Sequence, residues 1–167
     1  MHSKNRRFLL FLFLLGSGIY LLSHFCIQLY FITGVSMEPS YTSGEPVLIQ
    51  KWDLPDCLHT NDVIVIHRED LGRDIVKRIV ALPGDTVRIT DGILYVNGLP
   101  EQNTIQLPLM EDAGTASSDI LLGPGEYFVL GDNRNASIDS RFDEVGIIHA
   151  STITGKVLFP KVTITSE

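Results

Sequence analysis

Acidic residues are absent from the beginning of this 167-residue chain, in which the first one is Glu38. Three of the 13 Lys and Arg, namely Lys4, Arg6 and Arg7, precede it, which leaves 10 basic residues against 20 acidic ones. Nucleic-acid binding depends on clustered Lys and Arg that neutralise phosphates. The composition therefore excludes a nucleic-acid partner. The length suits one compact domain in addition to the apolar segment described below.

Cysteine is also scarce, with Cys26 in an apolar run and Cys57 far downstream. Two such separated residues do not form the framework of a disulfide-stabilised domain. No Cys-x-x-Cys pair occurs and the five His are scattered, so the usual ligand spacings of a zinc site are missing. We expect no metal and no cofactor.

Charged residues are missing again between Phe8 and Ile32. A helix of this length reaches about 37 Å at roughly 1.5 Å per residue, which exceeds a hydrocarbon core of about 30 Å. Basic residues precede the run and none directly follow it. The pattern predicts a cytoplasmic N-terminus over 1–7, one transmembrane anchor over 8–32 and an extracytoplasmic domain over 33–167, in the cell membrane.

Two other interpretations of the apolar run are a cleaved secretory signal and a lipid anchor. A cleaved secretory signal has a shorter apolar core followed by a small-x-small site, and no Ala-x-Ala follows this run. Lipid attachment at Cys26 needs small residues directly before it, whereas His24 and Phe25 stand there. An uncleaved anchor is favoured.

The domain from 33 onward reads as mainly β, an antiparallel sandwich or barrel, because short β-rich runs alternate with turn residues and no helical period is present. Asp91-Gly92 and Asn97-Gly98 are hairpin and turn signals. Pro and Gly punctuate a polar, loop-rich insertion at about 99–125. The expected strands are Val47–Gln50, Asp62–His67, Ile75–Leu82, Thr86–Thr90, Ile93–Val96, Glu126–Leu130, Thr154–Phe159 and Val162–Thr165.

Ser36 stands in the string Gly34-Val-Ser-Met-Glu-Pro, just past the apolar run. A hydroxyl is a weak nucleophile, so a catalytic serine needs a nearby base and donors for the oxyanion. Gly34 allows close approach of the backbone to a substrate. Taken alone, the string is more typical of an ordinary turn than of a catalytic site.

Lys77 shares one face of an expected strand with Ile75 and Ile79, because side chains alternate along a strand. Burial among them would lower the pKa of the amine, and a neutral amine near Ser36 can accept the hydroxyl proton. The competing interpretation is an edge lysine whose head stays in water. Arg78, on the other face, needs its own partner.

A third stretch, Gly131 to Arg141, concentrates charged and amide side chains around two serines at the end of an expected strand. It is either a solvated turn or a hydrogen-bonded network that supports a site. In the second case, the Ser137 hydroxyl would orient a neutral lysine, and Asp132 and Asp139 are the candidate partners of Arg78.

Taken together, these stretches resemble the type I signal peptidase family of the bacterial Ser/Lys type, in particular the small single-anchor enzymes of Gram-positive bacteria. The ordered motifs are Ser36-Met37-x-Pro39, Gly44-Glu-Pro-Val-Leu-Ile49, Lys77-Arg78 running into Pro83-Gly84-Asp85, and Gly131-Asp-Asn-Arg134 with Ser137 and Asp139-Ser-Arg141. The resemblance implies a membrane-anchored serine endopeptidase that cleaves signal peptides from secreted precursors at the outer membrane face.

The same resemblance assigns roles to residues. Ser36 would be the nucleophile, with its N–H in the oxyanion hole, Lys77 the general base and Ser137 the hydroxyl that orients Lys77. The supporting residues would be Arg78, Asp132, Asp139 and Arg141. The extended substrate would lie along residues near Gly34 and along the strand before Lys77, so that the binding residues are Gly34, Met37, Asp74, Ile75 and Val76.

Two other functions remain open. One is a non-catalytic or substrate-dedicated relative that serves pilus assembly and binds pilin-related precursors. The other is a self-cleaving repressor-type protein of similar fold, which would carry an N-terminal DNA-binding domain that this sequence lacks.

Overall fold

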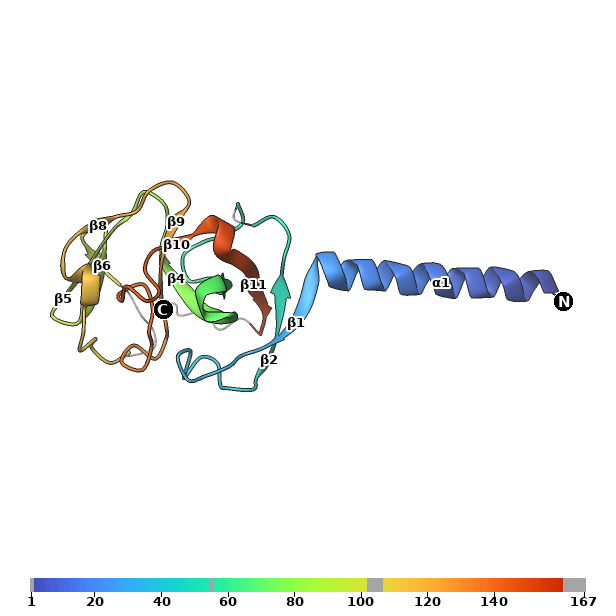
Figure 1. Cartoon of the computed structure of the whole chain (residues 1–167), viewed down its shortest axis with the longest axis horizontal. Helices are drawn as coiled ribbons and strands as arrows, with labels where there is room; N and C mark the ends of the chain where they lie inside the picture. The colour runs from blue at the N-terminus through green and yellow to red at the C-terminus, as the bar shows by residue number, and fades with distance from the viewer. Residues whose placement is uncertain (1, 55, 102–106, 161–167) are drawn as a thin grey trace.

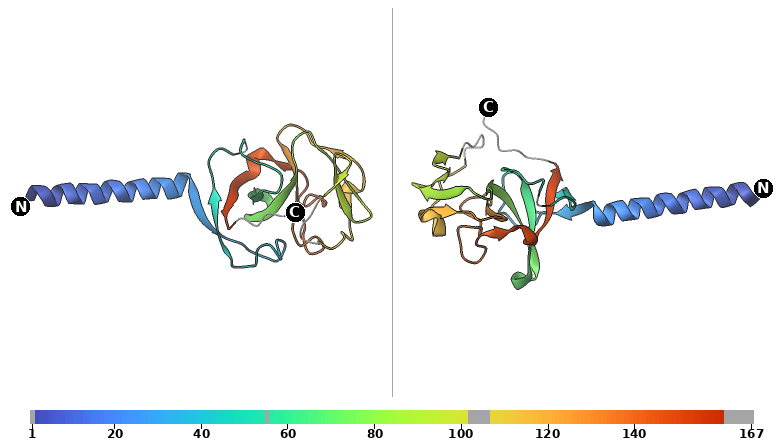
Figure 2. Two further views of the ribbon diagram at one scale, coloured as in Figure 1. Left: turned by 180° about the vertical axis from the view of Figure 1, so that it is seen from behind. Right: turned by 90° about the horizontal axis from the view of Figure 1, so that it is seen from above.

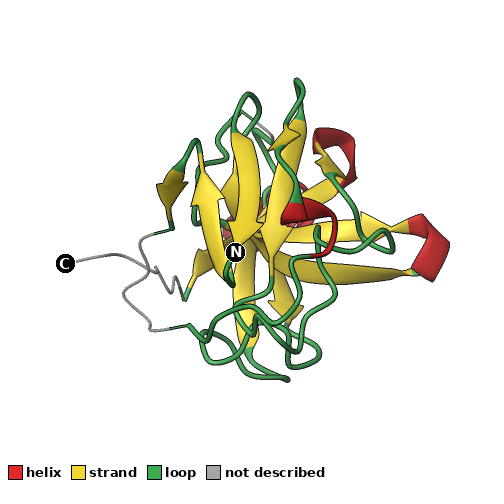
Figure 3. Cartoon of the chain, turned by 90° about the vertical axis from the view of Figure 1, so that its left-hand side faces the viewer, coloured by secondary structure: helices red, strands yellow, loops and turns green. Residues whose placement is uncertain are grey.

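The computed structural model describes residues 2–54, 56–101 and 107–160 of the chain. Helix α1 (His2–Phe25) projects from a body built almost entirely of antiparallel strands (Figure 1). Two further views confirm that the helix stands clear of the body along its whole length (Figure 2). In the described part of the body, helical structure is limited to three short 3-10 turns, η1 (Glu69–Leu71), η2 (Gly114–Ser117) and η3 (Ala150–Thr152) (Figure 3).

The larger sheet has seven strands in the order β1-β2-β11-β3-β4-β9-β10. Its long central strand β4 pairs with β3 along Arg73–Arg78 and with β9 only from Arg78 onward. Residues 73–77 of β4 therefore have one described strand neighbour and one open edge. The bounds are β1 Ile27–Phe31, β2 Pro46–Gln50, β3 Val63–Arg68, β4 Arg73–Ala81, β9 Glu126–Leu130, β10 Ile148–His149 and β11 Ile153–Phe159.

The smaller sheet has the order β7-β6-β5-β8, with β5 Thr86–Thr90, β6 Ile93–Val96, β7 Leu99–Pro100 and β8 Ile120–Leu121. Asp91 and Gly92 join β5 to β6, both at positive φ (52° and 75°), as a tight two-residue hairpin turn requires. Asn97-Gly98 repeats this geometry before β7. Both turn predictions are confirmed.

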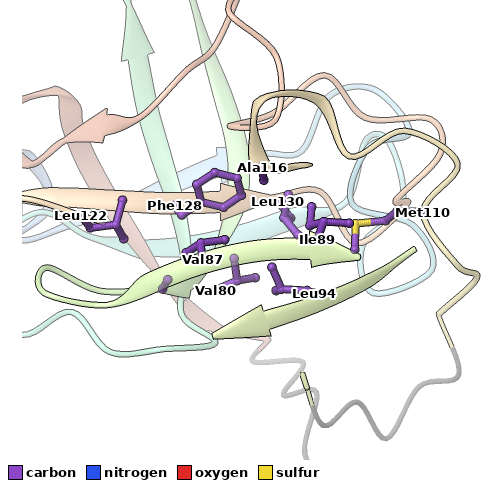
Figure 4. Packing of buried hydrophobic residues seen from close by; sticks show 10 residues of the cluster. Val80, Val87, Ile89, Leu94, Met110, Ala116, Leu122, Phe128 and Leu130 are labelled. Carbon is purple, nitrogen blue, oxygen red and sulfur yellow. The ribbon is translucent and has the colours of Figure 1, made fainter. Parts of the chain in front are cut away.

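Three clusters of buried apolar residues hold the sheets together. One fills the space between the small sheet and strands β4 and β9, where Val80 and Phe128 face Val87 and Leu94 (Figure 4). The other two lie on opposite faces of the larger sheet: Val76 belongs to one and Ile79 to the other. Strand β4 thus contributes to all three clusters.

The expected anchor over 8–32 is divided between two elements. Helix α1 ends at Phe25, and Ile27–Phe31 forms strand β1, which pairs with β2 over its full length. Strand β1 was not predicted, because an apolar run without charges does not itself mark where a helix gives way to an edge strand. Among the described residues, no helix is both long enough and apolar enough to span a membrane.

The other expected strands lie close to the observed ones, with shifts of one or two residues at β2, β3, β4 and β11 and exact bounds at β5, β6 and β9. The expected strand Val162–Thr165 lies outside the described residues. Within the insertion at about 99–125, the structure places β7, η2 and β8, and residues 102–106 also lie outside the described part.

Candidate active site

A cleft of about 540 Å³ opens along the free edge of β4. One wall comes from the segment that follows β1, another from the first five residues of β4, and the third from the loops after β9. Its lining residues are Tyr30, Thr33, Gly34, Val35, Ser36, Arg73, Asp74, Ile75, Val76, Lys77, Ala136, Ile138, Glu144 and Val145.

Ser36 reaches the cleft through a tight turn. Gly34 has a φ of +82°, a conformation that residues with a β-carbon rarely adopt. The turn closes when the Glu38 N–H donates to the Val35 carbonyl over 3.2 Å. Strand β1 and the buried Ile32 fix the beginning of this segment, so the hydroxyl of Ser36 is held at the cleft surface.

Lys77 meets Ser36 in the cleft. Its Nζ lies 2.8 Å from the Ser36 Oγ, although 41 residues separate them in the chain. The lysine is only 4% exposed, and among the described residues no carboxylate lies within ion-pair distance of its amine. Burial lowers the pKa of Lys77 from 10.5 to about 8, against the opposing influence of Asp139 and Asp132.

Arg78 points to the other side of β4 and is also buried. Its Nε and Nη2 donate to the two carboxylate oxygens of Asp132 at 2.8 and 2.6 Å. Its Nη1 donates to the Asn61 carbonyl at 2.8 Å. Of the two partners considered for Arg78, the structure selects Asp132, in the fork-to-fork geometry that favours arginine over lysine.

Asp139 and Arg141 form a second buried pair, with Arg141 Nε 2.8 Å from Asp139 Oδ1. The Arg141 guanidinium also donates to the carbonyls of Asp112, Arg134 and Ser137. The stretch Gly131–Arg141 is thus an internally bonded network rather than a solvated turn.

Gly131 is where this network touches the segment that carries Ser36. A β-carbon at this position would come within 2.2 Å of the Ser137 Oγ and 2.5 Å of the Ser36 carbonyl oxygen. Only glycine allows the two groups to approach so closely. The Ser137 Oγ is buried and has no hydrogen-bond partner among the described residues, which leaves this hydroxyl available to a group at the dyad.

Asn133 was not predicted as a site residue. Its backbone N–H donates to the Ser36 carbonyl at 3.0 Å, and its Nδ2 donates to the Val35 carbonyl at 3.2 Å. The Val35 carbonyl and the Ser36 N–H belong to one trans peptide and point in opposite directions. The bond from Asn133 Nδ2 to the Val35 carbonyl therefore leaves the Ser36 N–H pointing away from Asn133. Among the described residues, that N–H has no acceptor. The signals in the sequence were the polarity of the stretch and the place of Asn133 in the motif Gly131-Asp-Asn-Arg134.

The predicted substrate-binding residues divide into two groups. Gly34, Asp74, Ile75 and Val76 line the cleft. Met37 does not: it is 1% exposed and lies in the apolar cluster behind the cleft. The reason is that the turn at Ser36 reverses the chain and directs the next side chain into the core. Met37 therefore supports the wall from inside.

Comparisons with known proteins identify similar proteins of one kind, the signal peptidases. A family model described as "Signal peptidase, peptidase S26" matches residues 5–162. Signal peptidase I U of Bacillus subtilis (strain 168) is 36% identical over 121 residues, which are 67% of this chain and 64% of that protein.

Signal peptidase I of Bacillus licheniformis is 31% identical over 155 residues, covering 84% of this chain and 81% of the relative. A crystal structure of a signal peptidase I from Enterococcus faecalis matches with a TM-score of 0.47 and 29% identity, over 60% of this chain and 96% of that one.

Proposed function

The chain belongs to the signal peptidase family, peptidase S26, and we propose that it is a serine endopeptidase that removes signal peptides from secreted precursors. Ser36 is the nucleophile and Lys77 the general base. The observation that carries this assignment is the 2.8 Å contact between the Ser36 hydroxyl and a buried amine that has no carboxylate partner among the described residues. Burial lowers the pKa of this amine to about 8, so part of it is neutral at physiological pH and can act as a base.

The first half of the reaction forms an acyl-enzyme. Neutral Lys77 takes the proton of Ser36 Oγ while that oxygen attacks the carbonyl carbon of the scissile peptide bond. The Ser36 N–H donates to the developing oxyanion. When the tetrahedral intermediate collapses, Lys77 gives its proton to the departing amine, and the signal peptide stays on Ser36 as an ester.

The second half regenerates the enzyme. Lys77, neutral again, takes a proton from a water molecule that attacks the ester carbonyl. The second tetrahedral intermediate expels Ser36 Oγ, which recovers the proton from Lys77, and the signal peptide leaves with a free carboxyl end. Ser137 supports this cycle by accepting a hydrogen bond from the amine in its working orientation. The pairs Arg78–Asp132 and Asp139–Arg141 hold the surrounding backbone.

The open edge of β4 supports an extended binding mode for the substrate. Because β9 begins to pair only at Arg78, the N–H and carbonyl groups of residues 73–77 can form a ladder with an added strand. Gly34 faces this edge across the cleft. Half-buried Ile75 and buried Val76 leave room for small side chains next to the dyad, and precursor residues before the cut would occupy this edge.

Exposed apolar surface supports a position at the lipid bilayer, with residues 1–7 in the cytoplasm and the cleft outside. From Phe8 to Leu15 the side chains of α1 are 45–71% exposed. On the sheet, Leu29, Leu48 and Phe159 are exposed and lie in register across β1, β2 and β11. Alkaline extraction of membranes should leave the chain in the pellet, and added protease should digest the body only from the outer side. Release into the supernatant would contradict this position.

Processing of a precursor by the purified full chain tests the activity. Ser36→Ala and Lys77→Ala should each reduce the cleavage rate at least a thousandfold, because each removes a participant in the chemical step. Ser118→Ala and Lys51→Ala, which alter exposed residues of the same types, are the matched controls and should cleave normally.

The pH dependence gives a second readout of the same assignment. The fraction of neutral Lys77 grows as pH rises through its pKa of about 8, so the rate should increase up to that pH and level off above it. A rate that is flat between pH 6 and 10 would rule out Lys77 as the base. If both dyad variants still support secretion in cells, the chain would instead be a non-catalytic assembly factor.

A further inference from the structure

Arg68 connects two parts of the chain that flank the cleft. It is the last residue of β3, at the β3–β4 turn. From there, its Nη1 donates to the Val145 carbonyl at 3.1 Å and its Nη2 donates to the Glu144 carbonyl, across more than 75 residues of sequence. Glu144 and Val145 both line the cleft.

Asp70 holds the Arg68 guanidinium in this position. Its two carboxylate oxygens accept from Arg68 Nε and Nη2 at 2.9 and 2.8 Å, a bidentate pair within one short turn. The arginine side chain is 15% exposed, whereas that of Asp70 is 58% exposed. Asp70 therefore lies on the solvent side of the guanidinium, and the opposite side of the group contacts the carbonyls of the 144–145 loop.

The contact lies at the far end of the cleft from the dyad. Arg68 is paired across the strands with Arg73, the first residue of the open edge. From Arg73 to Lys77 the edge runs four residues, or about 13 Å at roughly 3.3 Å per residue. A substrate strand along this edge would pass between Arg73 and Glu144 about four or five residues before the cut.

We propose that Arg68 is a positioning residue that sets the far wall of the substrate cleft by holding the carbonyls of Glu144 and Val145. This inference rests on the proposed function and adds a specificity element to it. Without Arg68, the loop still keeps its own turn, in which the N–H groups of Val145 and Gly146 donate to the Phe142 carbonyl. The turn itself therefore survives, while its distance from the β4 edge is no longer fixed.

The consequence is a dependence on substrate length. A precursor peptide with six residues before the cut reaches the far wall, whereas one with only two residues before the cut ends near the dyad. Arg68 should therefore contribute to binding of the long peptide and not to the chemical step. A general loss of fold would affect both peptides alike.

Arg68→Met and Arg68→Lys in the full chain test the proposal with these two peptides. For Arg68→Met, we expect KM for the long peptide to rise roughly three- to tenfold with kcat unchanged, as loss of charge-assisted hydrogen bonds to one wall implies. The short peptide should be cleaved as by the wild type. Arg68→Lys, which keeps a charged donor, should recover part of the loss.

Arg88→Met is the matched control, since Arg88 also pairs with an aspartate, Asp119 at 3.6 Å, but on the small sheet. It should change neither peptide. Equal losses for both peptides, or a fall in kcat alone, would overturn the role of Arg68.

Binding of the labelled long peptide to Ser36→Ala, with and without Arg68→Met, separates the two proposals. If the wild type cleaves nothing, the proposed function fails, while an undiminished affinity in the double variant would overturn the inference about Arg68 by itself.

Discussion

Lys77 and Arg78 are neighbours on β4, both cationic and both buried, yet they stand in opposite electrostatic surroundings. Arg78 is 1% exposed and has a bidentate carboxylate and a backbone carbonyl as acceptors. Lys77 is 4% exposed and has only the Ser36 hydroxyl at hydrogen-bond distance among the described residues. The alternation of a strand is sufficient to separate them, because it sends consecutive side chains to opposite faces.

The difference shows how one strand serves both structure and chemistry. A paired buried arginine keeps its charge and ties β4 to the loop after β9. A buried lysine without a carboxylate partner has a lowered pKa, which suits the base of the proposed mechanism. The residues that contact the two sides of β4 are also neighbours in the chain. Asp132 binds Arg78, and the next residue, Asn133, binds the segment that carries Ser36.

Asp132→Asn would remove the carboxylate that pairs with Arg78 and so make the surroundings of Arg78 more like those of Lys77. Arginine does not lose its proton in compensation, so the buried charge remains. We expect the free energy of unfolding to fall by about 3–5 kcal/mol, the typical cost of removing one partner of a buried pair. Denaturant unfolding of the full chain in mild detergent measures it.

Asp119→Asn is the control for that change, because it breaks the exposed pair with Arg88 at the surface. It should alter the free energy of unfolding by less than about 0.5 kcal/mol. A similar small effect of Asp132→Asn would show that the Arg78 pair does not hold the site.

Lys77→Met should have the opposite effect on the free energy of unfolding. It should stabilise the fold, while it abolishes activity. Below pH 8 the lysine is charged in both the folded and unfolded states, and the folded state carries the cost of burying that charge. The cost disappears as pH rises from about 8 to 10.5, where the amine is neutral in both states. At pH 7 the gain should be on the order of 3 kcal/mol, since the pKa falls from 10.5 to about 8 and each pKa unit corresponds to about 1.4 kcal/mol.

The same denaturant experiment at pH 7 and above pH 10.5 measures this effect. The stability difference between Lys77→Met and the wild type should shrink toward zero at the higher pH. A constant difference would mean that it reflects the packing of methionine rather than the charge.

Asn133→Ala should give the smallest effect, because it removes one hydrogen bond to the Val35 carbonyl and leaves the Asn133 backbone contact to Ser36 in place. We expect kcat to fall roughly fivefold to tenfold with little change in KM, the equivalent of about 1 kcal/mol in orienting the oxyanion donor. Steady-state cleavage of a precursor peptide measures both constants.

Asn135 offers a close control within the same stretch. Its Nδ2 likewise donates to a backbone carbonyl, that of Leu109 at 3.0 Å, which belongs to another segment than the one that carries Ser36. Asn135→Ala should leave kcat unchanged. Equal losses in both variants would trace the effect to the stability of the stretch as a whole.

The bounds of a strand could be predicted from the sequence where a turn motif marks its end. Strands β5 and β6 have the predicted bounds because a two-residue turn at Asp91-Gly92 fixes where each ends. The two-residue strands β7, β8 and β10 were missed, since such short segments are defined by their partners rather than by their own composition. Strand β1 was hidden within an apolar run for the same reason.

The site shows the same division between local and long-range information. Alternation along β4 correctly put Lys77 and Arg78 on different faces, and the structure brings Ser36 to Lys77. The place of Met37 in the core depends on how the turn at Ser36 folds back. The contacts of Asn133 and Arg68 join segments about 75 to 100 residues apart, which no local pattern encodes.

The junction between α1 and β1 has a mechanical consequence. Only Cys26 separates the two elements, and even its carbonyl is bonded to the Lys51 N–H at 2.9 Å. The connection between helix and sheet is therefore short and tied to the sheet. A rotation of the helix would act directly on the sheet edge, which leads to Ser36 ten residues after Cys26. Flexible residues inserted at this junction would uncouple the orientation of the helix from that of the sheet, while every side chain of the cleft stays unchanged.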